Sequence, residues 1–437
     1  MLEKLGITAL NDMQREAGDA ILRGKQDVVV LSPTGTGKTL AYLLPLVELV
    51  DARQDVPQAL VIVPGRELAM QSDRVLKDLG SGLRSAACYG GRTAMEEHRR
   101  LKEVKPQIIF GTPGRLNDHL DKGNISPYAV RYLVIDEFDK CLEMGFHDEM
   151  ARLLKKLPGV RRHILLSATD ADAIPDFVSM GRTQRIDYLS DEEQVNDRVT
   201  AYVVKSPVKD KLATLRQLLC SFGDQQTVVF LGFRDAVERV GDYLRREGFA
   251  ASVFHGGMEQ KQREDALYKF SNGSANVFVS TDLGSRGLDI PDIQNIVHYH
   301  LPLHEQELVH RVGRTARWDK QGRTFFIVGP EEQLPEFVDC DTEEYSLPSL
   351  PREGLGVSLP QMATIYIGKG KKDKISKGDI VGFLCKKGGL QPSEIGRIDV
   401  MDRYAYVAVS RPRFEQVLRL TKGEKIKGIK TVIEPVK

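Results

Sequence analysis

The chain has 437 residues, which is long for a single hydrophobic core and favours two or three domains. Its composition, 41% hydrophobic and 28% charged with a net charge of +1, is typical of a soluble globular protein. The five cysteines are scattered and never spaced as C-x-x-C, which argues against a disulfide framework or a zinc site. No apolar run is long enough to span a membrane, and the first residues lack the apolar core of a signal peptide, so we expect a cytoplasmic protein.

The near-neutral net charge hides an asymmetry between the two ends of the chain. Residues 361–437 contain 17 Lys and Arg against 8 Asp and Glu, a net charge of +9, so the preceding residues carry −8. A basic C-terminal module on a mildly acidic body favours binding of a polyanion, with nucleic acid as the first candidate. Lysines that are merely solvated are the alternative.

Two series of short β-branched runs alternate with helical stretches. Alternation of this kind predicts an α/β fold in which helices cover both faces of parallel sheets. We therefore expect two tandem doubly wound domains, residues 1–193 and 194–343, joined in a polar, acidic connector at 189–200; the resemblance given below implies that both are RecA-like. The predicted strands are 27–31, 59–63, 107–110, 132–135 and 163–166 in the first domain, and 227–231, 251–254, 276–280, 295–299 and 324–328 in the second.

Residues 344–360 are rich in Pro and Gly, which block both helices and central strands, and this segment is predicted to be a linker. The remaining residues, 361–437, form a small α+β module. Its predicted strands are 364–368, 378–385, 395–402 and 404–410, and its predicted helix is 413–420.

The stretch "LSPTGTGKTL" (31–40) follows a predicted strand and precedes a helical run. Gly35 and Gly37 free the backbone to wrap a phosphate at the helix N-terminus, where Lys38 would reach the β- and γ-phosphates and Thr39 would ligate Mg²⁺. Ser32 stands where the general P-loop pattern has its first glycine, and an ordinary glycine-rich turn is the alternative. The expected ATP-binding residues here are Ser32, Pro33, Thr34, Gly35, Thr36, Gly37, Lys38 and Thr39.

The stretch "VIDEFD" (134–139) ends another predicted strand, and ligands bind at such strand ends in open α/β sheets. Asp136 would hold Mg²⁺ and Glu137 would orient or deprotonate the attacking water. A solvated acidic turn is less favoured, because a P-loop lies about a hundred residues upstream. Phe138 is unusual: its ring could fill a pocket behind the strand, or it could crowd Ser167–Thr169.

The stretch "HRVGRTAR" (310–317) places Arg311, Arg314 and Arg317 three residues apart, so that they could share one helical face. Arg314 and Arg317 are candidate arginine fingers toward the γ-phosphate, an interaction worth roughly 10³–10⁵ in rate. A solvated basic helix is the alternative.

With these motifs in this order, residues 1–345 resemble the core of the DEAD-box RNA helicases of superfamily 2. The resemblance implies that Gln14 reads the adenine edge, that Asp289 faces the nucleotide, and that Ser167 and Thr169 couple hydrolysis to strand separation. The RNA contacts that it implies in the core are Pro64, Gly65, Arg66, Gly90, Gly91, Thr112, Pro113, Gly114, Arg115, Gln260, Arg263, Thr281 and Asp282.

The sequence departs from the family pattern at three places. Phe138 replaces an alanine, Gly65 replaces a threonine, and "LNDM" (10–13) replaces a proline-rich run. The family's upstream aromatic residue, which stacks on adenine, would lie before residue 1, so the selectivity for adenine rests on Gln14.

Residues 361–437 resemble the RRM-like domain of the bacterial DbpA-type helicases, which bind a hairpin of 23S ribosomal RNA. Tyr404 and Tyr406 alternate along a predicted strand and so project from one face, where they could stack bases; alternate aromatics in a core are the competing interpretation. The expected phosphate contacts are Lys369, Lys371, Lys372, Arg397, Arg403, Arg411 and the lysines of 422–430.

These observations together predict an RNA-dependent ATPase and ATP-dependent RNA helicase that locally unwinds short duplexes with ATP and Mg²⁺. The resemblance of the tail implies structured ribosomal RNA and pre-ribosomal particles as partners, a role in large-subunit assembly, and a monomer without membrane attachment. Two alternatives stay open: an ATP-gated RNA clamp or annealing factor, and a DNA-directed helicase of superfamily 2, which Gln14 and the RRM-like tail disfavour.

Overall fold

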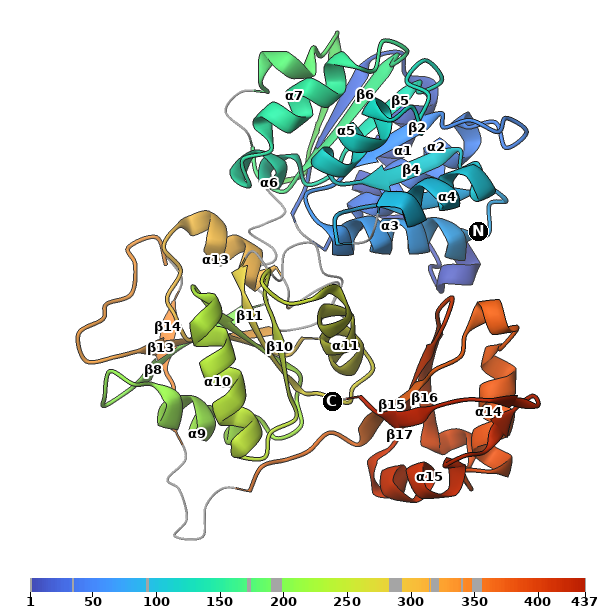
Figure 1. Ribbon diagram of the computed structural model, residues 1–437. Helices are drawn as coiled ribbons and strands as arrows, with labels where there is room; N and C mark the ends of the chain where they lie inside the picture. The colour runs from blue at the N-terminus through green and yellow to red at the C-terminus, as the bar shows by residue number, and fades with distance from the viewer. Residues whose placement is uncertain are drawn as a thin grey trace. The chain divides into compact units, whose positions relative to one another are not determined.

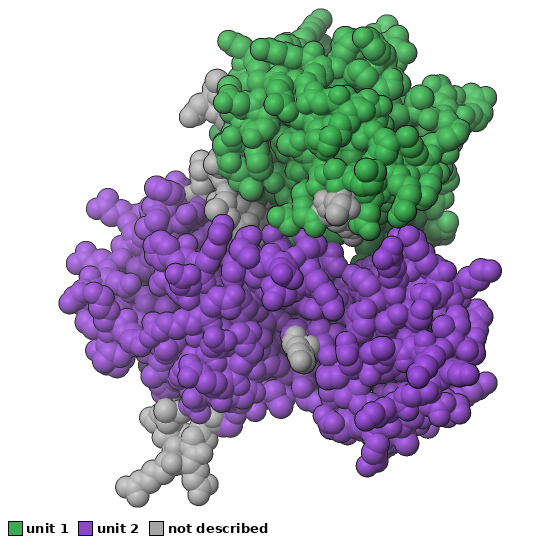
Figure 2. All heavy atoms as spheres, in the orientation of Figure 1, with its two compact units in different colours: residues 1–197, 286–289 green, residues 198–285, 290–437 purple. Residues whose placement is uncertain are grey.

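The computed structural model describes residues 2–33, 35–91, 94–170, 174–189, 199–282, 293–313, 315, 322–338, 341–347 and 356–436. The chain divides into two compact units, residues 1–197 with 286–289 and residues 198–285 with 290–437, which Figure 2 colours green and purple. The elements of both units are labelled in Figure 1.

The first unit is built on a parallel sheet of seven strands in the order β3-β4-β2-β5-β6-β1-β7. The strands are β1 Asp27–Leu31, β2 Ala59–Ile62, β3 Ser85–Cys88, β4 Ile108–Gly111, β5 Tyr132–Ile135, β6 Arg162–Ser167 and β7 Thr183–Asp187. The helices are α1 Asp12–Arg23, α2 Lys38–Leu49, α3 Arg66–Leu79, α4 Ala94–Val104, α5 Pro113–Asp121, α6 Phe138–Glu143 and α7 His147–Lys155.

Helices cover both faces of this sheet, which is why its central strands are apolar throughout. Along β1, Val28 and Val30 pack in one core cluster with α1, α2 and α3, whereas Val29 and Leu31 pack in another with α5, α6 and α7. Alternate residues of a strand point to opposite faces, so each strand must supply apolar side chains to both clusters.

The second unit repeats this plan with the strand order β10-β11-β9-β12-β13-β8-β14, again all parallel. The two tandem RecA-like sheets that the sequence predicts are therefore confirmed. The strands are β8 Val199–Lys205, β9 Thr227–Leu231, β10 Ala251–Phe254, β11 Val277–Thr281, β12 Asn295–His298, β13 Gly322–Val328 and β14 Thr342–Glu344, and the helices are α9 Leu212–Phe222, α10 Arg234–Arg246, α11 Gln260–Ser271 and α13 Glu305–Val312.

Four strands of these sheets were not predicted. Three of them, β3, β7 and β14, lie at sheet edges, and the fourth, β8, pairs with β14 next to an edge. Their sequences, such as SAAC in β3 and TQRID in β7, lack the continuous β-branched runs of the central strands. Strands β7 and β14 are largely exposed, and β3 is buried but made of small residues, so none of the three shows the pattern typical of a central strand.

The second unit also contains the C-terminal module, a four-stranded antiparallel sheet in the order β16-β17-β15-β20. Its strands are β15 Met362–Ile367, β16 Ile395–Val400, β17 Ala405–Ser410 and β20 Ile433–Pro435, with a small hairpin of β18 Lys425–Ile426 and β19 Ile429–Lys430 and two helices, α14 Lys377–Lys386 and α15 Phe414–Thr421. This α+β fold agrees with the prediction.

One element of the module was predicted wrongly: residues 378–385 form most of helix α14 and not a strand. Ser376 caps this helix by accepting a hydrogen bond from the backbone N–H of Asp379, whose carboxylate bonds back to Ser376. Ile380, Phe383 and Leu384 then share one buried face at helical spacing. The capping box was the signal that distinguishes the two structures.

The predicted linker begins inside the sheet of the second unit. Strand β14 ends at Glu344, and the backbone N–H of Tyr345 donates to the carbonyl of Val203 on β8. Tyr345, Leu347 and Val357 pack against the core of this unit. Both ends of the Pro- and Gly-rich segment are therefore held.

None of the helices among the described residues is long and apolar enough to cross a membrane.

Asp27, the first residue of β1, ties three strands of the first sheet together. Its buried carboxylate accepts hydrogen bonds from the backbone N–H of His163 on β6 and of Gly181 before β7, each at 2.7 Å, and from the His163 ring at 3.3 Å. Burial by itself raises the pKa of Asp27, but these hydrogen bonds outweigh it and hold the pKa below its usual value.

We expect Asp27→Asn to lower the free energy of unfolding of the first unit by about 1–3 kcal/mol at pH 7, because an amide has one acceptor oxygen for these donors. Since the folded-state pKa lies below the unfolded one, the contribution of the carboxylate is present above the unfolded value and is lost as the pH falls through the folded value. Urea unfolding between pH 3 and pH 7 should therefore show the wild type and variant converging below about pH 4. Asp19→Asn, on the exposed face of α1, is the control and should change little at any pH.

Candidate active site and RNA interface

The phosphate-binding turn joins β1 to α2 at the carboxyl edge of the first sheet. Gly35 and Gly37 have φ of +85° and +82°, a left-handed conformation that side chains disfavour. The Lys38 ammonium is buried and donates to the carbonyls of Ser32 and Pro33, at 2.8 Å for the latter. Burial lowers the pKa of Lys38 to about 8, although Asp139 and Asp136 oppose the shift. The turn thus places a cation and two glycines with left-handed backbone conformation where the sequence predicts phosphates.

Helix α1 holds this turn from one side. Gln14 donates through Nε2 to the carbonyl of Gly37 at 3.1 Å, and Asn11 donates through Nδ2 to the carbonyl of Thr36 at 2.9 Å. Gln14 and Asn11 also cap α1 reciprocally. A Cβ on Gly37 would collide with Gln14. The contact of Asn11 was not foreseen, although the capping-box spacing of Asn11 and Gln14 was a readable signal.

The acidic pair lies on a second turn at the same edge, where β5 runs into α6 and β6 separates β5 from β1. Asp136 is 2% exposed and its Oδ1 accepts from the backbone N–H of Glu137 at 3.0 Å. Glu137 has φ of +53°, a conformation that costs a non-glycine residue of order 1–3 kcal/mol and recurs at functional sites. Burial, reinforced by the charge of Glu137, raises the pKa of Asp136 to about 7, and Lys38 opposes this shift.

A second buried lysine, which the sequence analysis did not single out, accompanies the acids. Lys140 on α6 is fully buried, and its Nζ lies 3.5 Å from Oε1 of Glu137. Oε2 of Glu137 is buried and has no hydrogen-bond partner among the described residues. A buried carboxylate oxygen with an unused lone pair is what a positioned water or a hydrated cation needs.

The segment after β6 closes the edge of the site. Ser167 Oγ donates to the carbonyl of Thr169 at 2.6 Å, and Thr169 Oγ1 donates to Oδ2 of Asp139 at 3.1 Å. The last acid of "DEFD" is thus connected to the segment that the resemblance assigns to coupling.

Phe138 is 2% exposed and packs in the core cluster that contains α5 and α7. A small cavity of about 30 Å³ remains between its ring and Ser167, lined also by Val29, Leu31, Leu165, Asp170, Ile174 and Arg185. Since space remains beside Ser167, the arrangement supports the first of the two hypotheses for Phe138, a ring that fills a pocket behind the strand.

The three expected RNA segments of the first unit follow β2, β3 and β4, which are neighbours in the sheet. Gly65 is the N-cap of α3, and Thr112 is the N-cap of α5 with Pro113 at its first turn. The Arg66 guanidinium lies against Gly91, whose φ is +96°. The sheet order therefore brings Pro64–Arg66, Gly90–Gly91 and Thr112–Arg115 to one edge.

Arg115 is supported by a buried polar cluster beneath that edge. Its Nε lies 3.5 Å from Oε2 of Glu97, and the same oxygen lies 3.0 Å from Nε2 of His119. Oε1 of Glu97 accepts from the backbone N–H of Tyr89 at 3.0 Å. Cys88 completes a group of potential ligand atoms within 4.8 Å of one another, but the carboxylate already faces the Arg115 guanidinium, whose charge disfavours a cation there.

In the second unit, Asp282 follows β11 and is bound by Arg311 of α13. Arg311 Nη2 donates to Oδ2 of Asp282 at 2.7 Å, and its Nη1 donates to the carbonyl of His300 at 2.8 Å. Arg311 is 2% exposed, so this is a buried, bidentate ion pair. Thr281 is 8% exposed beside it.

Helix α13 ends at Val312, and Thr315 forms a β-bridge with Ile293. In the described part of the chain, Arg311 is therefore the last of the three arginines that lies on this helix. Four predicted site residues lie outside the described residues: Thr34, Asp289, Arg314 and Arg317.

On α11, Gln260 donates to Oε1 of Glu264 at 3.2 Å, and the Arg263 guanidinium lies over the Phe254 ring at 4.8 Å. Arg263 is 7% exposed. Both residues lie in the N-terminal half of α11, a helix that packs on its own sheet and also contacts the C-terminal module.

The expected phosphate contacts of the C-terminal module differ in their surroundings. Arg403, Lys371 and Lys372 are exposed, whereas Lys369 pairs with Asp373 at 2.9 Å and Arg397 pairs with Asp399 at 2.7 Å. The Arg411 guanidinium donates hydrogen bonds to the backbone carbonyls of Pro360, Met362 and Ser274. Burial lowers the pKa of Arg411.

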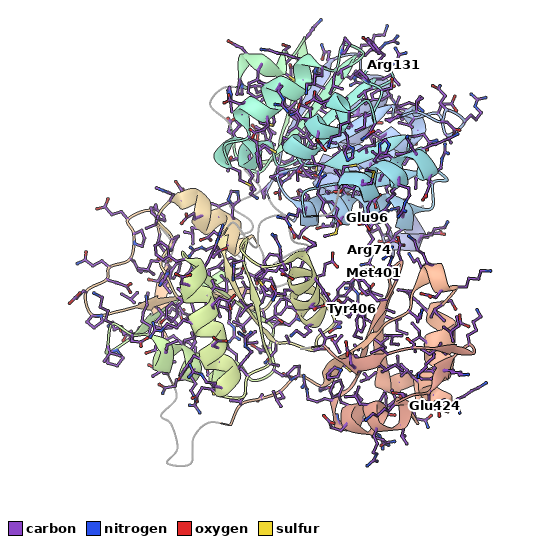
Figure 3. The ribbon with its side chains drawn as sticks, viewed as in Figure 1. Arg74, Glu96, Arg131, Met401, Tyr406 and Glu424 are labelled. Atoms are coloured by element: carbon purple, nitrogen blue, oxygen red, sulfur yellow. The ribbon has the colours of Figure 1, made fainter. Side chains whose placement is uncertain are left out.

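Tyr404 and Tyr406 share one face of the sheet as expected, but that face is covered. Tyr406 is 1% exposed and its hydroxyl donates to Asp265 of α11, and the Tyr404 hydroxyl donates to Glu264 at 2.6 Å. Figure 3 labels Tyr406 at the junction of α11 and the C-terminal sheet. The exposure expected of these rings is therefore not found at Tyr406.

Three family models match the chain, one for each of the two seven-stranded sheets and one for the C-terminal module. A DEAD/DEAH box helicase model matches residues 11–177, a helicase conserved C-terminal domain matches 210–319, and a DbpA RNA binding domain matches 364–435. The chain belongs to the DEAD-box helicases. It is accordingly an ATP-hydrolysing, ATP-dependent RNA helicase.

The similarity to curated DEAD-box helicases extends over the whole chain. The ATP-dependent RNA helicase DbpA of Escherichia coli is 36% identical, with 98% of this chain and 94% of that protein covered. DbpA of Bacillus subtilis is 30% identical, with coverage of 98% and 95%.

Solved structures of DEAD-box helicases share the fold. Mss116p bound to single-stranded RNA and AMP-PNP gives a TM-score of 0.71 at 25% identity, over 80% of this chain and 76% of that one. Dbp5 of S. cerevisiae gives 0.69 at 23% identity, over 79% and 92%.

We expect Phe138→Ala to lower the free energy of unfolding by about 3–5 kcal/mol, because it removes a buried ring from a packed core. Phe138→Leu, which keeps most of the volume, should cost about 1.5 kcal/mol or less. Chemical denaturation followed by circular dichroism measures both. At temperatures where all variants are folded, ATP hydrolysis and strand displacement should stay in the wild-type ratio; a changed ratio would show that the ring crowds Ser167–Thr169.

Proposed function

We propose that this DEAD-box helicase locally unwinds short RNA duplexes and remodels ribosomal RNA during assembly of the large ribosomal subunit. The observation that supports this most directly is the combination, in one chain, of a P-loop and an acidic pair on one RecA-like sheet, a second RecA-like sheet, and a DbpA RNA binding domain. The target assignment rests on the similarity to DbpA proteins. We further propose that the protein acts as a monomer on structured ribosomal RNA within pre-ribosomal particles.

The residues at the edge of the first sheet divide the chemistry among them. Lys38 neutralises the β- and γ-phosphates, and Glu137 orients the attacking water through the carboxylate oxygen that has no partner in the described part of the chain. Thr39 and Asp136 would hold Mg²⁺, which supplies charge stabilisation for the transferred phosphoryl group. The raised pKa of Asp136 fits this role, since a buried carboxyl that holds its charge poorly benefits from a cation beside it.

The extent of unwinding follows from the energy of base stacking. Stacking is about 1.4 kcal/mol per step in DNA, so opening five or six comparable RNA pairs costs about 7–8 kcal/mol. A cost of this size suits local strand separation at a target that the C-terminal module holds nearby, where a tether raises the local concentration of the core.

An ATP-gated clamp is the second candidate, and strand displacement distinguishes it from a helicase. We expect the wild type to displace a strand from a short RNA duplex with ATP, and Glu137→Gln to lose about 10²–10⁴-fold in ATP turnover because a neutral amide cannot accept the water proton. Glu96→Gln on the exposed face of α4 is the control. Wild-type protein that hydrolyses ATP with RNA but displaces no strand would favour the clamp.

The arginine-finger assignment has a separate test. Arg314→Ala should reduce ATP hydrolysis by roughly 10³–10⁵ while leaving nucleotide binding to the first domain intact, since the finger acts on the transition state. Binding of a fluorescent ATP analogue and steady-state turnover measure the two effects. Arg246→Ala, at the exposed end of α10, is the matched control. Equal losses of binding and hydrolysis would remove the assignment.

A further inference from the structure

Phe233 is an aromatic residue that is exposed at the carboxyl edge of the second parallel sheet. It follows β9, whose residues are all buried, and yet its own relative exposure is 70%. It is also the N-cap of α10, where its side chain makes no hydrogen bond to the helix. Ser, Thr, Asp and Asn are preferred at this position, because their side chains satisfy a free backbone N–H of the first turn. Phe233 therefore adds little to the core and does not cap its helix, and such a departure from local preference is expected at functional sites.

The sheet places Phe233 between the ends of two neighbouring strands. β9 lies between β11 and β12. β11 ends at Thr281 and is followed by Asp282, both expected RNA contacts, and β12 leads into His300. Arg311 joins these two ends, because it binds the carboxylate of Asp282 and the carbonyl of His300. The frame around Phe233 is therefore fixed, and one side of it carries residues that are expected to contact RNA.

The ring of Phe233 rests on an imidazole that is itself held in place. The ring centroids of Phe233 and His300 are 5.9 Å apart in an edge-to-face arrangement. His300 Nδ1 accepts a hydrogen bond from the backbone N–H of Gly232 at 3.1 Å, which ties the imidazole to the residue before Phe233. An exposed aromatic ring with one supported edge can bind a flat ligand with little loss of conformational freedom.

A base of single-stranded RNA is the ligand that this ring fits. Every base has a π-face, so an aromatic side chain can stack on unpaired nucleotides of any sequence. A base inside a duplex has its faces covered by its neighbours, and the ring therefore selects RNA that is already unpaired. Arg234, the next residue, is exposed and supplies a positive charge for a phosphate beside such a base. A protein partner would need a much larger surface than a single ring offers.

We propose that Phe233 is a stacking platform for one base of the RNA strand that the core binds. The stacked base would lie beside Thr281 and Asp282, and only an unpaired base could make this contact. The ring would thus favour strand separation by stabilising its product. The inference rests on the proposed binding of RNA by the core and is independent of the proposed ribosomal target.

The first test measures binding of a short fluorescein-labelled single-stranded RNA to the full-length protein, by anisotropy with a non-hydrolysable ATP analogue present. Phe233→Ala should weaken binding by about fivefold to a hundredfold, the range for loss of one base–aromatic stack. Phe233→Trp should bind at least as tightly as the wild type. Phe233→Leu, which keeps apolar bulk without a π-face, should be as weak as Phe233→Ala.

Two controls separate stacking from other causes of weaker binding. Tyr128→Ala removes an aromatic side chain that is 74% exposed between α5 and β5 of the first unit, and it should leave the affinity unchanged. Phe233→Ser supplies the hydroxyl that α10 lacks at its N-cap, so its midpoint of urea unfolding should equal or exceed that of the wild type. Its affinity for RNA should nevertheless fall as far as that of Phe233→Ala.

The second test identifies the stacked base. When 2-aminopurine is placed at successive positions of the RNA, its fluorescence should be quenched at one position in the wild-type complex and not in the Phe233→Ala complex. An abasic nucleotide at that position should weaken binding to the wild type about as much as Phe233→Ala does. The same abasic RNA should bind the variant no more weakly than the intact RNA does, because the two changes remove one interaction.

Three outcomes would overturn the stacking role alone. They are unchanged RNA affinity of Phe233→Ala, full affinity of Phe233→Leu, and equal losses from the abasic nucleotide in the wild type and in Phe233→Ala. Wild-type protein that binds no single-stranded RNA at all would overturn the proposed function together with this inference, and it is recognised before any variant is made.

Discussion

Four charged groups are buried together where β1 and β5 end, and their mutual compensation is the constraint on which the first unit depends. Lys38 and Lys140 face Asp136 and Glu137 with almost no exposure to water, an arrangement that is tolerable only while each charge has an opposite one nearby. Burial pushes the pKa of Lys38 down and that of Asp136 up, so that both pKa values come close to neutral pH. These groups can therefore change protonation near neutral pH, and burying their charges lowers the stability of the fold. The apolar packing on both faces of the parallel strands offsets this loss.

Strands with continuous apolar runs were predictable because burial on both faces demands such runs, and β1, β5, β9 and the edge strand β10 have the predicted limits. The other three edge strands, β3, β7 and β14, were missed because their sequences contain no such run. The segment 378–385 was misread for a related reason: a short apolar stretch fits a buried strand and a buried helix equally well, and only the Ser376–Asp379 capping box separates them.

The position of the candidate site was predictable wherever a motif combines residue type with a place on the sheet. The turns that carry "GTGKT" and "VIDEFD" lie at the same edge of the first sheet, and the chemistry assigned to their residues stays a prediction. Which side chains pack over a given residue could not be predicted from the sequence. The Tyr404 hydroxyl meets Glu264, 140 positions away in the chain, and local alternation says only that Tyr404 and Tyr406 share a face. Glu97 and Lys140 were missed because supporting residues take their roles from partners that no local pattern reveals, whereas Asn11 was missed although its capping-box spacing to Gln14 was a readable signal.

The buried pair of Arg311 and Asp282 has a genetic consequence. One guanidinium joins the end of β11, which carries the expected RNA contacts Thr281 and Asp282, to the helix that leads directly into Arg314. A substitution at either member of the pair would disturb both ends of this connection at once. Alleles of Arg311 would combine RNA-binding and hydrolysis defects although Arg311 is not itself an expected contact of either substrate, and a compensating change would be sought first at Asp282.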